Sequence, residues 1–299
     1  MRTQGLISSL LAVVLVLILI LIFDAPHALG CSAYTFEKLS RPILDPDLDE
    51  MSGLVLGGLE PDTLVHIRDS GNDPLLVYTK RDGTIIGRYP FGPTATDPEE
   101  ITRGACPWGG ACIFVFDTGD NFHIRSERHI WAVEENTLLT KTPHTQKFEF
   151  HFPGYQALDV EAAVLVDKTF YFFAKERKHA RVFALDSAVW KGEKNASEAK
   201  LITDLPITMI TGAASTKDGK RLLLINWQGA TELSKEGQKS DPKAADSFYP
   251  YRKKIKLKDL EQQEGITYDA DEKSFLYTSE KKMIFSKGNY GIMRATCVP

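Results

Sequence analysis

The stretch Glu161-Ala162-Ala163, followed by an apolar segment at residues 170–174 and the polar pair Lys175-Glu176, is one copy of a repeated unit. Each copy begins with a small or acidic residue, then glycine or a near substitute, and continues into an apolar strand. A second apolar strand follows and ends in a polar cluster. The copies begin at Ser52-Gly53-Leu54, Glu99-Glu100-Ile101, Glu161-Ala162-Ala163, Thr211-Gly212-Ala213 and Glu264-Gly265-Ile266. A period of about fifty residues is typical of β-propellers, in which each repeat forms one blade.

The other strands of each unit can also be read from the sequence. Second strands are expected at residues 64–68, 112–116, 170–174, 221–225 and 275–278. Third and fourth strands are expected at residues 75–79, 85–89, 130–133, 147–152, 181–185 and 199–202. Turn sequences such as Arg81-Asp82-Gly83 and Lys217-Asp218-Gly219 separate them. No long amphipathic helical pattern occurs after residue 31, which indicates an all-β chain.

The repeats predict one closed domain at residues 31–299. We expect a single β-propeller with five recognisable blades, because the chain holds five copies of the unit. The fifth copy is short of strands, and residues 34–39 can supply its outer strand from the N-terminus. Six blades are an alternative if residues 233–259 form an irregular blade. A β-sandwich in which the period is accidental is a weaker alternative.

Residues 1–30 are predicted to be an export signal. Arg2 precedes an apolar run at residues 6–23, and Ala28-Leu29-Gly30 has the small-x-small pattern of a cleavage site. The length of the run also fits a retained anchor, and Ala28-Leu29-Gly30-Cys31 resembles a lipobox, which would make Cys31 a lipidated N-terminus. We expect a secreted or periplasmic protein, or alternatively a membrane-anchored one that faces outward, either as a lipoprotein or through an uncleaved N-terminal segment.

The four cysteines predict two disulfides in an oxidising compartment. Cys106 and Cys112 stand at the two ends of a short Gly/Pro loop, and a local bridge is expected there. Cys31 and Cys297 can pair only if the fold brings the termini together, as closure by an N-terminal strand would. Metal ligation by these cysteines is the weaker interpretation, because the sequence has no C-x-x-C pair.

The charge balance argues against one class of partner. The chain has a formal net charge of −4 and a pI near 6.0, so the composition implies no basic face. We therefore expect no nucleic-acid partner. A monomer that binds a small-molecule ligand or a partner loop is the expected form.

Acidic residues recur where the first strand of a repeat begins and where its second strand ends. In a propeller these positions lie on one face, at the mouth of the central channel. The acidic and amide residues at such positions are Glu50, Asp69, Asp97, Glu99, Glu100, Asp117, Asp120, Asn121, Asp159, Glu161, Glu176, Asn226, Glu264 and Glu280. So many carboxylates repel one another unless a cation lies among them.

Calcium is the natural counter-charge, because it takes six to eight oxygen ligands. The predicted metal ligands are Glu99, Asp117, Asp120, Glu161 and Glu264. The predicted ligand-binding residues around them are His66, Arg68, Asp69, Lys175, Asn226 and Glu280. Salt bridges without a metal, made by Arg68, Lys175, Arg177 and Lys178, are the alternative.

Several of these segments, in this order, resemble a known group of proteins. They are Glu50-Met51-Ser52-Gly53-Leu54, His66-Ile67-Arg68-Asp69-Ser70-Gly71, Asp97-Pro98-Glu99-Glu100-Ile101, Asp117-Thr118-Gly119-Asp120-Asn121, Asp159-Val160-Glu161-Ala162 and Gln263-Glu264-Gly265-Ile266. The chain resembles bacterial secreted β-propellers of the SdiA-regulated and phytase-like kind. The resemblance implies an acidic, calcium-loaded upper face and leaves the activity open. Pro98 and Arg68 depart from the usual pattern, and Arg68 places a cation inside the expected site.

Two functions follow as hypotheses. The first is an extracytoplasmic binding protein with an acidic, calcium-binding channel mouth. The alternative is a metal-dependent hydrolase of phosphoesters or esters, in which bound calcium activates water. The first is preferred because no G-x-S-x-G, P-loop or H-E-x-x-H motif supplies a dedicated nucleophile or base.

Overall fold

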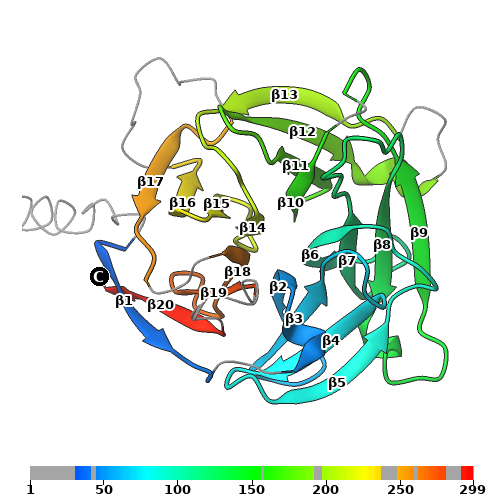
Figure 1. Cartoon of the computed structure of the whole chain (residues 1–299), viewed down its shortest axis with the longest axis horizontal. Coiled ribbons are helices and arrows are strands. Elements are labelled where there is room, and N and C mark those ends of the chain that lie inside the picture. Colours follow the sequence, from blue (N-terminus) through cyan, green and yellow to red (C-terminus); the bar gives the residue numbers. More distant parts are fainter. Residues whose placement is uncertain are drawn as a thin grey trace, which may run out of the picture.

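The computed structural model describes residues 31–41, 45–155, 158–191, 197–236, 248–258, 262–280 and 291–298. Over these residues the chain forms five four-stranded antiparallel sheets arranged in a ring around a central channel (Figure 1). The predicted all-β, five-bladed propeller is confirmed. The six-blade alternative is wrong, because residues 251–255 form the outer strand of blade 4 rather than part of a further blade. The predicted signal segment, residues 1–30, lies outside the described residues.

Each blade runs from an inner strand at the channel to an outer strand at the rim. Blade 1 contains β2 (Met51–Leu56), β3 (Thr63–Arg68), β4 (Leu75–Lys80) and β5 (Ile85–Pro90). Blade 2 contains β6 (Pro98–Ala105), β7 (Ala111–Asp117), β8 (Arg128–Glu134) and β9 (Thr145–Phe150). Blade 3 contains β10 (Val160–Val166), β11 (Thr169–Ala174), β12 (Ala180–Asp186) and β13 (Lys200–Leu205).

The last two blades complete the ring. Blade 4 contains β14 (Gly212–Ser215), β15 (Arg221–Asn226), β16 (Gly229–Ser234) and β17 (Tyr251–Ile255). Blade 5 contains β18 (Gln263–Tyr268), β19 (Phe275–Ser279), β20 (Met293–Val298) and, as its outer strand, β1 (Ala33–Lys38). Short 3-10 helices lie at Pro46–Leu48, Glu135–Thr137 and Ser187–Lys191. No helix in the described part of the chain is long and apolar enough to cross a membrane.

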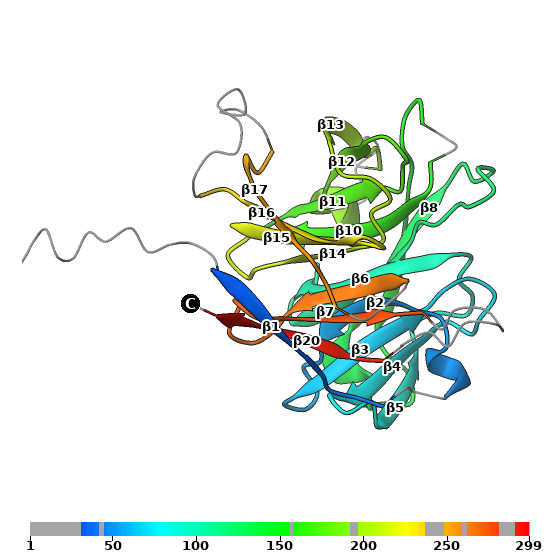
Figure 2. The same ribbon diagram turned by 60° about the vertical axis from the view of Figure 1, so that its left-hand side comes forward.

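The N-terminal strand closes the ring, as predicted. β1 pairs antiparallel with β20, so that Tyr34 lies opposite Cys297 (Figure 2). A disulfide joins Cys31 to Cys297 across a Cα–Cα distance of 5.3 Å, and a second joins Cys106 to Cys112 across 4.9 Å. Both predicted disulfides are therefore confirmed, and the first fixes the two ends of the propeller to each other.

Apolar side chains fill the space between neighbouring blades. Between blades 2 and 3, for example, Phe114 and Phe116 pack edge-on against Phe170, with ring centroids 5.3 and 5.7 Å apart. All three rings are fully buried. Because burial of one phenylalanine side chain contributes about 1.5–3 kcal/mol, these contacts hold blades 2 and 3 together.

Five blades bring the inner strands very close together. A Cβ on Gly212 would lie 1.9 Å from the Glu264 carbonyl oxygen, and a Cβ on Gly265 would lie 2.7 Å from that of Ser52. Only glycine fits where one inner strand meets the backbone of the next. The inner strands of neighbouring blades are therefore in close contact at these positions.

Candidate functional site

A β-bulge near the start of the inner strand aims an acidic side chain at the channel mouth in three blades. The strand register shifts between Pro98 and Glu100, so Glu99 has no partner residue in the ladder. The same irregularity occurs between Val160 and Ala162, at Glu161, and between Gln263 and Ile266, at Glu264. A bulge redirects the side chain of the extra residue. This explains the glutamate that recurs in the sequence repeat.

These glutamates lie in a cluster that we name the acidic mouth. It comprises Asp69, Asp97, Glu99, Asp159, Glu161, Glu264 and Glu280. One carboxylate oxygen each from Asp69, Asp97 and Glu99 lies within 4.8 Å of the other two, and the same holds for Glu99, Asp159 and Glu161. Glu99 therefore belongs to two oxygen triads, and blades 1, 2 and 3 all contribute to them.

Several oxygens of the acidic mouth are buried without a hydrogen-bond partner. They are Asp97 Oδ1, Glu99 Oε1 and Glu161 Oε2. Glu99 and Glu161 are each only 4% exposed. Gly119 contributes to this isolation, because a Cβ there would lie 2.1 Å from Glu99 Oε1, so its bare Cα packs against the carboxylate. A buried acceptor without a donor is costly, and its presence points to a group that would bind there.

Burial and mutual repulsion raise the pKa values across the acidic mouth. Burial, together with the neighbouring Asp69 carboxylate, raises the pKa of Asp97 to about 7. Burial raises the pKa of Glu161 to about 8 even though Lys175 opposes the shift. The pKa of Glu99 is raised well above its ordinary value by burial and then by the charge of Glu161. The pKa of Glu280 is raised to about 7 by burial and by Asp69. A positively charged group would therefore be stabilised at the acidic mouth.

Among the described residues, Lys175 is the basic side chain that forms an ion pair with the acidic mouth. It follows β11 and forms an ion pair with Glu161. Burial acts to lower the pKa of Lys175, but the Glu161 carboxylate outweighs it and raises that pKa. Its ammonium group also lies 5.7 Å from the ring centre of Trp227, which donates a 3.2 Å hydrogen bond to Glu264. Trp227 is 46% exposed and so presents an aromatic face at the rim.

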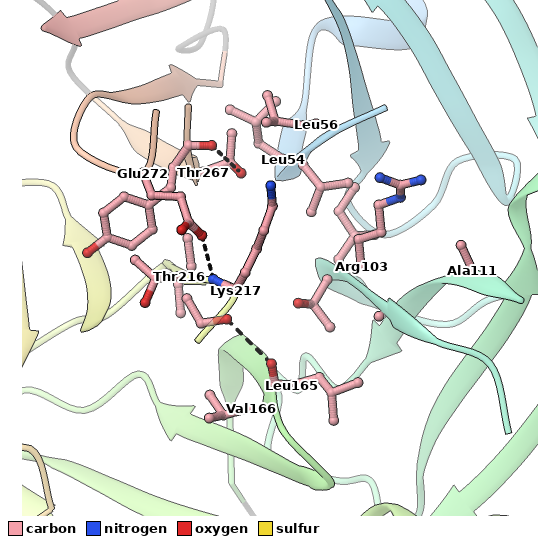
Figure 3. A pocket seen from close by; sticks show the side chains of 18 of the residues that line it. Leu54, Leu56, Arg103, Ala111, Leu165, Val166, Thr216, Lys217, Thr267 and Glu272 are labelled. Carbon is pink, nitrogen blue, oxygen red and sulfur yellow. Dashed lines mark hydrogen bonds between the residues drawn. The ribbon is translucent and has the colours of Figure 1, made fainter. Parts of the chain in front are cut away.

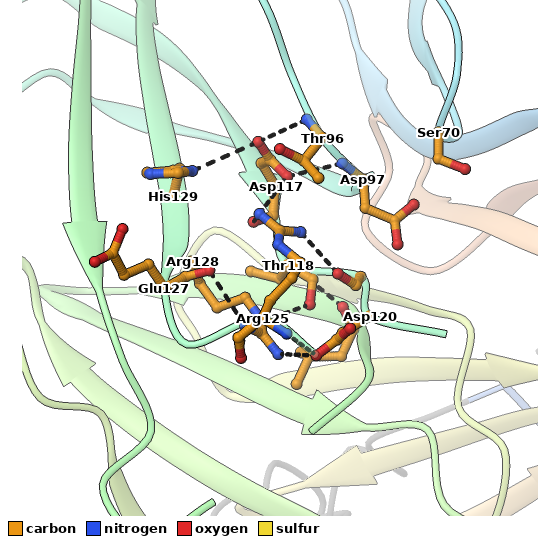
Figure 4. A network of polar contacts seen from close by, with 12 residues as sticks. Ser70, Thr96, Asp97, Asp117, Thr118, Asp120, Arg125, Glu127, Arg128 and His129 are labelled. Atoms are coloured by element: carbon orange, nitrogen blue, oxygen red, sulfur yellow. Dashed lines mark hydrogen bonds and ion pairs between the residues drawn. The ribbon is translucent and has the colours of Figure 1, made fainter. Parts of the chain in front are cut away.

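Asp117 and Asp120 bind the protein's own donors instead. Asp117 accepts hydrogen bonds from the backbone of Thr96 and Asp97 and an ion pair from Arg125 (Figure 4). Although burial acts to raise its pKa, the hydrogen bond from His129 and the charge of Arg125 lower that pKa to about 2.

Asp120 has an equally complete set of partners. It accepts hydrogen bonds from the backbone of Ile124 and Arg125 and pairs with the fully buried Arg128 at 2.9 Å. These two carboxylates shape the loop after β7. The structure thus brings Glu99, Glu161 and Glu264 together at the mouth and places Asp117 and Asp120 in the loop beside it.

The residues predicted to bind a ligand are also divided. Asp69, Lys175 and Glu280 lie at the acidic mouth. His66 is fully buried in β3 and hydrogen bonds to Thr79 of β4 at 2.9 Å. Asn226 holds its own turn, because its side chain donates to Thr208 and accepts from the backbone of Gln228.

Arg68 directs its guanidinium to Asn72, which in turn donates a 2.7 Å hydrogen bond to Glu50. It therefore lies in a polar chain at the rim of blade 1.

Sequence reasoning did not single out two residues of the acidic mouth and two exposed apolar residues of the β7–β8 loop. Asp97 and Asp159 complete the oxygen triads, although they were expected only as members of the wider acidic set. Phe122 and Ile124 are 84% and 80% exposed on the loop that Asp120, Arg125 and Arg128 brace. Two apolar residues in a loop that begins with Asp-Thr-Gly-Asp-Asn were the available signal.

Comparisons with known proteins add little to this description. No family model and no curated protein matches the sequence. Among solved structures, the chain is similar to an auxiliary nutrient binding protein from Bacteroides thetaiotaomicron, with 8% identity, a TM-score of 0.46, and 88% of this chain and 77% of that chain covered. It is also similar to the PQQ-bound aldose sugar dehydrogenase from Streptomyces coelicolor, with 9% identity, a TM-score of 0.47, and 89% and 99% covered. Likenesses this weak carry no argument about function.

Proposed function

We propose that this protein is an extracytoplasmic binding protein whose acidic mouth binds a calcium ion. Glu99 would be the central ligand, because it belongs to both oxygen triads. Asp97 and Asp69 would complete the site on one side, or Asp159 and Glu161 on the other. The two disulfides support an oxidising, extracytoplasmic location.

The observation that carries the proposal is the set of buried oxygens without partners. Glu99 Oε1 and Asp97 Oδ1 accept no hydrogen bond from any described residue. Hard cations that prefer oxygen suit such a donor set, and calcium tolerates the irregular geometry of carboxylates that come from different blades. A cation would also offset the repulsion that raises the pKa values of these groups.

The lysine of the site does not replace that cation. Lys175 pairs with Glu161 and lies over Trp227, so its charge is directed to the side of blades 3 and 4. The salt-bridge alternative would require a second basic side chain against Glu99 Oε1. The half-exposed Trp227 then supplies an apolar face on which a small-molecule ligand or a partner loop would rest above the ion.

Calorimetric titration of the purified mature protein with calcium tests the proposal. We expect saturable binding to the wild type and at least about tenfold weaker binding to Glu99→Gln, which keeps the shape of the side chain and removes one charged ligand. Glu60→Gln is the matched control, because Glu60 is an exposed glutamate in the β2–β3 turn. Equal affinities in all three proteins would contradict the proposal, as would no binding to any of them.

Asp97 favours one second candidate, the metal-dependent hydrolase. Burial and the Asp69 carboxylate raise its pKa to about 7 in the absence of a cation, so a bound cation would stabilise its charged form, and the carboxylate could then orient a water on that cation. Phosphate release from a set of phosphoesters, measured with calcium and then with chelator, tests this function on the same samples. Release that needs calcium and is lost in both Glu99→Gln and Asp97→Asn would establish the hydrolase. Calcium binding without phosphate release would contradict the hydrolase and support the binding protein.

A further inference from the structure

The opposite end of the channel contains a cavity of about 620 Å³, which we name the lower cavity (Figure 3). It is lined by the second halves of the five inner strands and by the turns that follow them. Glu100 and the closely packed glycines close the channel between it and the acidic mouth. The lower cavity is therefore a separate space, and its volume lies in the range of small-molecule sites.

About half of its wall is apolar. Leu54, Leu56, Ile101, Leu165 and Val166 line it, and they come from three different blades. Gly104 lets Leu165 pack closely against β6, because a Cβ on Gly104 would lie 2.6 Å from Leu165 Cδ2. This lining suits the apolar part of a ligand and contrasts with the carboxylates at the other end of the channel.

One cation reaches into this apolar space. The side chain of Lys217 extends from the β14–β15 turn into the cavity (Figure 3). Its backbone N–H donates a 2.6 Å hydrogen bond to Glu272 of the β18–β19 turn, which fixes the backbone of the turn. No described carboxylate lies within 4.0 Å of Lys217 Nζ.

The other charged groups around the lower cavity have partners or lie at its rim. Arg103 forms a 2.7 Å ion pair with the buried Glu135 and is thereby neutralised. Asp269 is held by Arg81 and Arg294. Asp167 and Glu272 also line the cavity and carry negative charge: Asp167 is exposed in its turn, and Glu272 accepts a hydrogen bond from the Lys217 backbone. Lys217 is thus the lining cation that no described carboxylate pairs with, and it would attract an anionic group.

We propose that the lower cavity is a second binding site, for a small apolar molecule that carries one anionic group. The apolar part would pack against the partly exposed Leu56 and Leu165, and the carboxylate or sulfonate would pair with Lys217. This site is independent of the calcium proposed at the acidic mouth. The two proposals can therefore be confirmed or contradicted separately.

A matched pair of fluorescent probes tests the proposal. 1-Anilinonaphthalene-8-sulfonate carries the anion, and N-phenyl-1-naphthylamine has the same ring system without it. We expect saturable, one-site binding of both to the wild type, with the sulfonate about tenfold tighter, in chelator as well as in calcium. Octanoate should displace both probes, because it combines a chain and a carboxylate.

Variants locate the binding. Lys217→Ala should weaken sulfonate binding about tenfold and leave the neutral amine unchanged. Lys220→Ala is the control, because it removes the same charge from the same turn while its partner, Glu236, lies outside the cavity. Leu165→Glu should weaken both probes and the sulfonate more. Far-ultraviolet circular dichroism and the melting temperature check that each variant is folded. Unsaturable binding, or folded Lys217→Ala and Leu165→Glu variants with wild-type affinities, would overturn the proposal.

Discussion

Glu100 of β6 reaches across the channel and accepts a 2.7 Å hydrogen bond from the backbone N–H of Ala213 in β14. Its other oxygen accepts a 2.9 Å bond from the backbone of Ile101, and the backbone of Leu54 in β2 also donates to this carboxylate. One fully buried side chain thereby connects the inner strands of blades 1, 2 and 4. It also forms the floor between the acidic mouth and the lower cavity.

This arrangement predicts a large effect for a small substitution. Glu100→Gln keeps the volume but turns one acceptor into a donor, which then faces a backbone N–H in a buried place. We expect the free energy of unfolding to fall by about 1–3 kcal/mol, and by more for Glu100→Ala, which leaves the N–H groups unpaired. Urea unfolding measures the change, with Glu60→Gln as the exposed control. An equally stable Glu100→Gln would show that the bridge contributes nothing.

Lys175 is predicted to compete with the cation at the acidic mouth. Lys175→Met removes a positive charge that pairs with Glu161, so calcium should bind about tenfold more tightly. Without calcium the same variant should be less stable, because Glu161 loses its partner and takes up a proton instead. Calorimetry and calcium-dependent melting check both effects. Weaker calcium binding in Lys175→Met would instead indicate that Lys175 holds the site in shape.

The buried His66 should make the free energy of unfolding depend on pH. Burial lowers its pKa from 6.5 to about 3, so the folded protein keeps the imidazole neutral where the unfolded chain would protonate it. Its contribution to stability is therefore complete above pH 6.5 and is lost as the pH falls towards 3. His66→Gln can still hydrogen bond to Thr79 and does not titrate. We expect a shallower fall in the urea midpoint between pH 6.5 and 4 for this variant. Identical pH profiles would contradict the assignment.

The two disulfides should differ in their effect on stability. Cys31 and Cys297 are 266 residues apart, whereas Cys106 and Cys112 are 6 apart. Because the loop entropy removed from the unfolded chain grows with length, replacing the first pair by serines should cost about 5 kcal/mol and the second about 2 kcal/mol. Urea unfolding of the two double variants compares them. A larger loss for the Cys106–Cys112 pair would show that ring closure does not depend on the terminal bridge.

The repeat predicted the blades because a strand that is covered on both faces carries a nearly continuous run of apolar residues. β3, β7, β11, β15 and β19 were found for that reason. The outer part of blade 4 was not, because β17 reads Tyr-Arg-Lys-Lys-Ile and lies at the rim with Ile255 as its buried residue. Edge strands carry little of the pattern on which such predictions rest.

For the candidate site, sequence position alone could bring the acidic residues to one end of the channel. It could not separate Asp97, whose Oδ1 has no partner, from Asp117, which binds two backbone N–H groups and Arg125. That difference depends on how the loop from Asp120 to Arg128 folds back, and no residue spacing shows it. The lower cavity also could not be predicted from the sequence, because its lining comes from inner strands that are far apart in the sequence.

The most direct test of the central claim is a crystal structure of the protein grown with saturating calcium, with anomalous difference density recorded. We predict a peak at the acidic mouth, about 2.3–2.6 Å from a carboxylate oxygen of Glu99 and from oxygens of either Asp97 and Asp69 or Asp159 and Glu161. An absent peak, with a basic side chain or water hydrogen bonded to Glu99 Oε1 instead, would contradict the account.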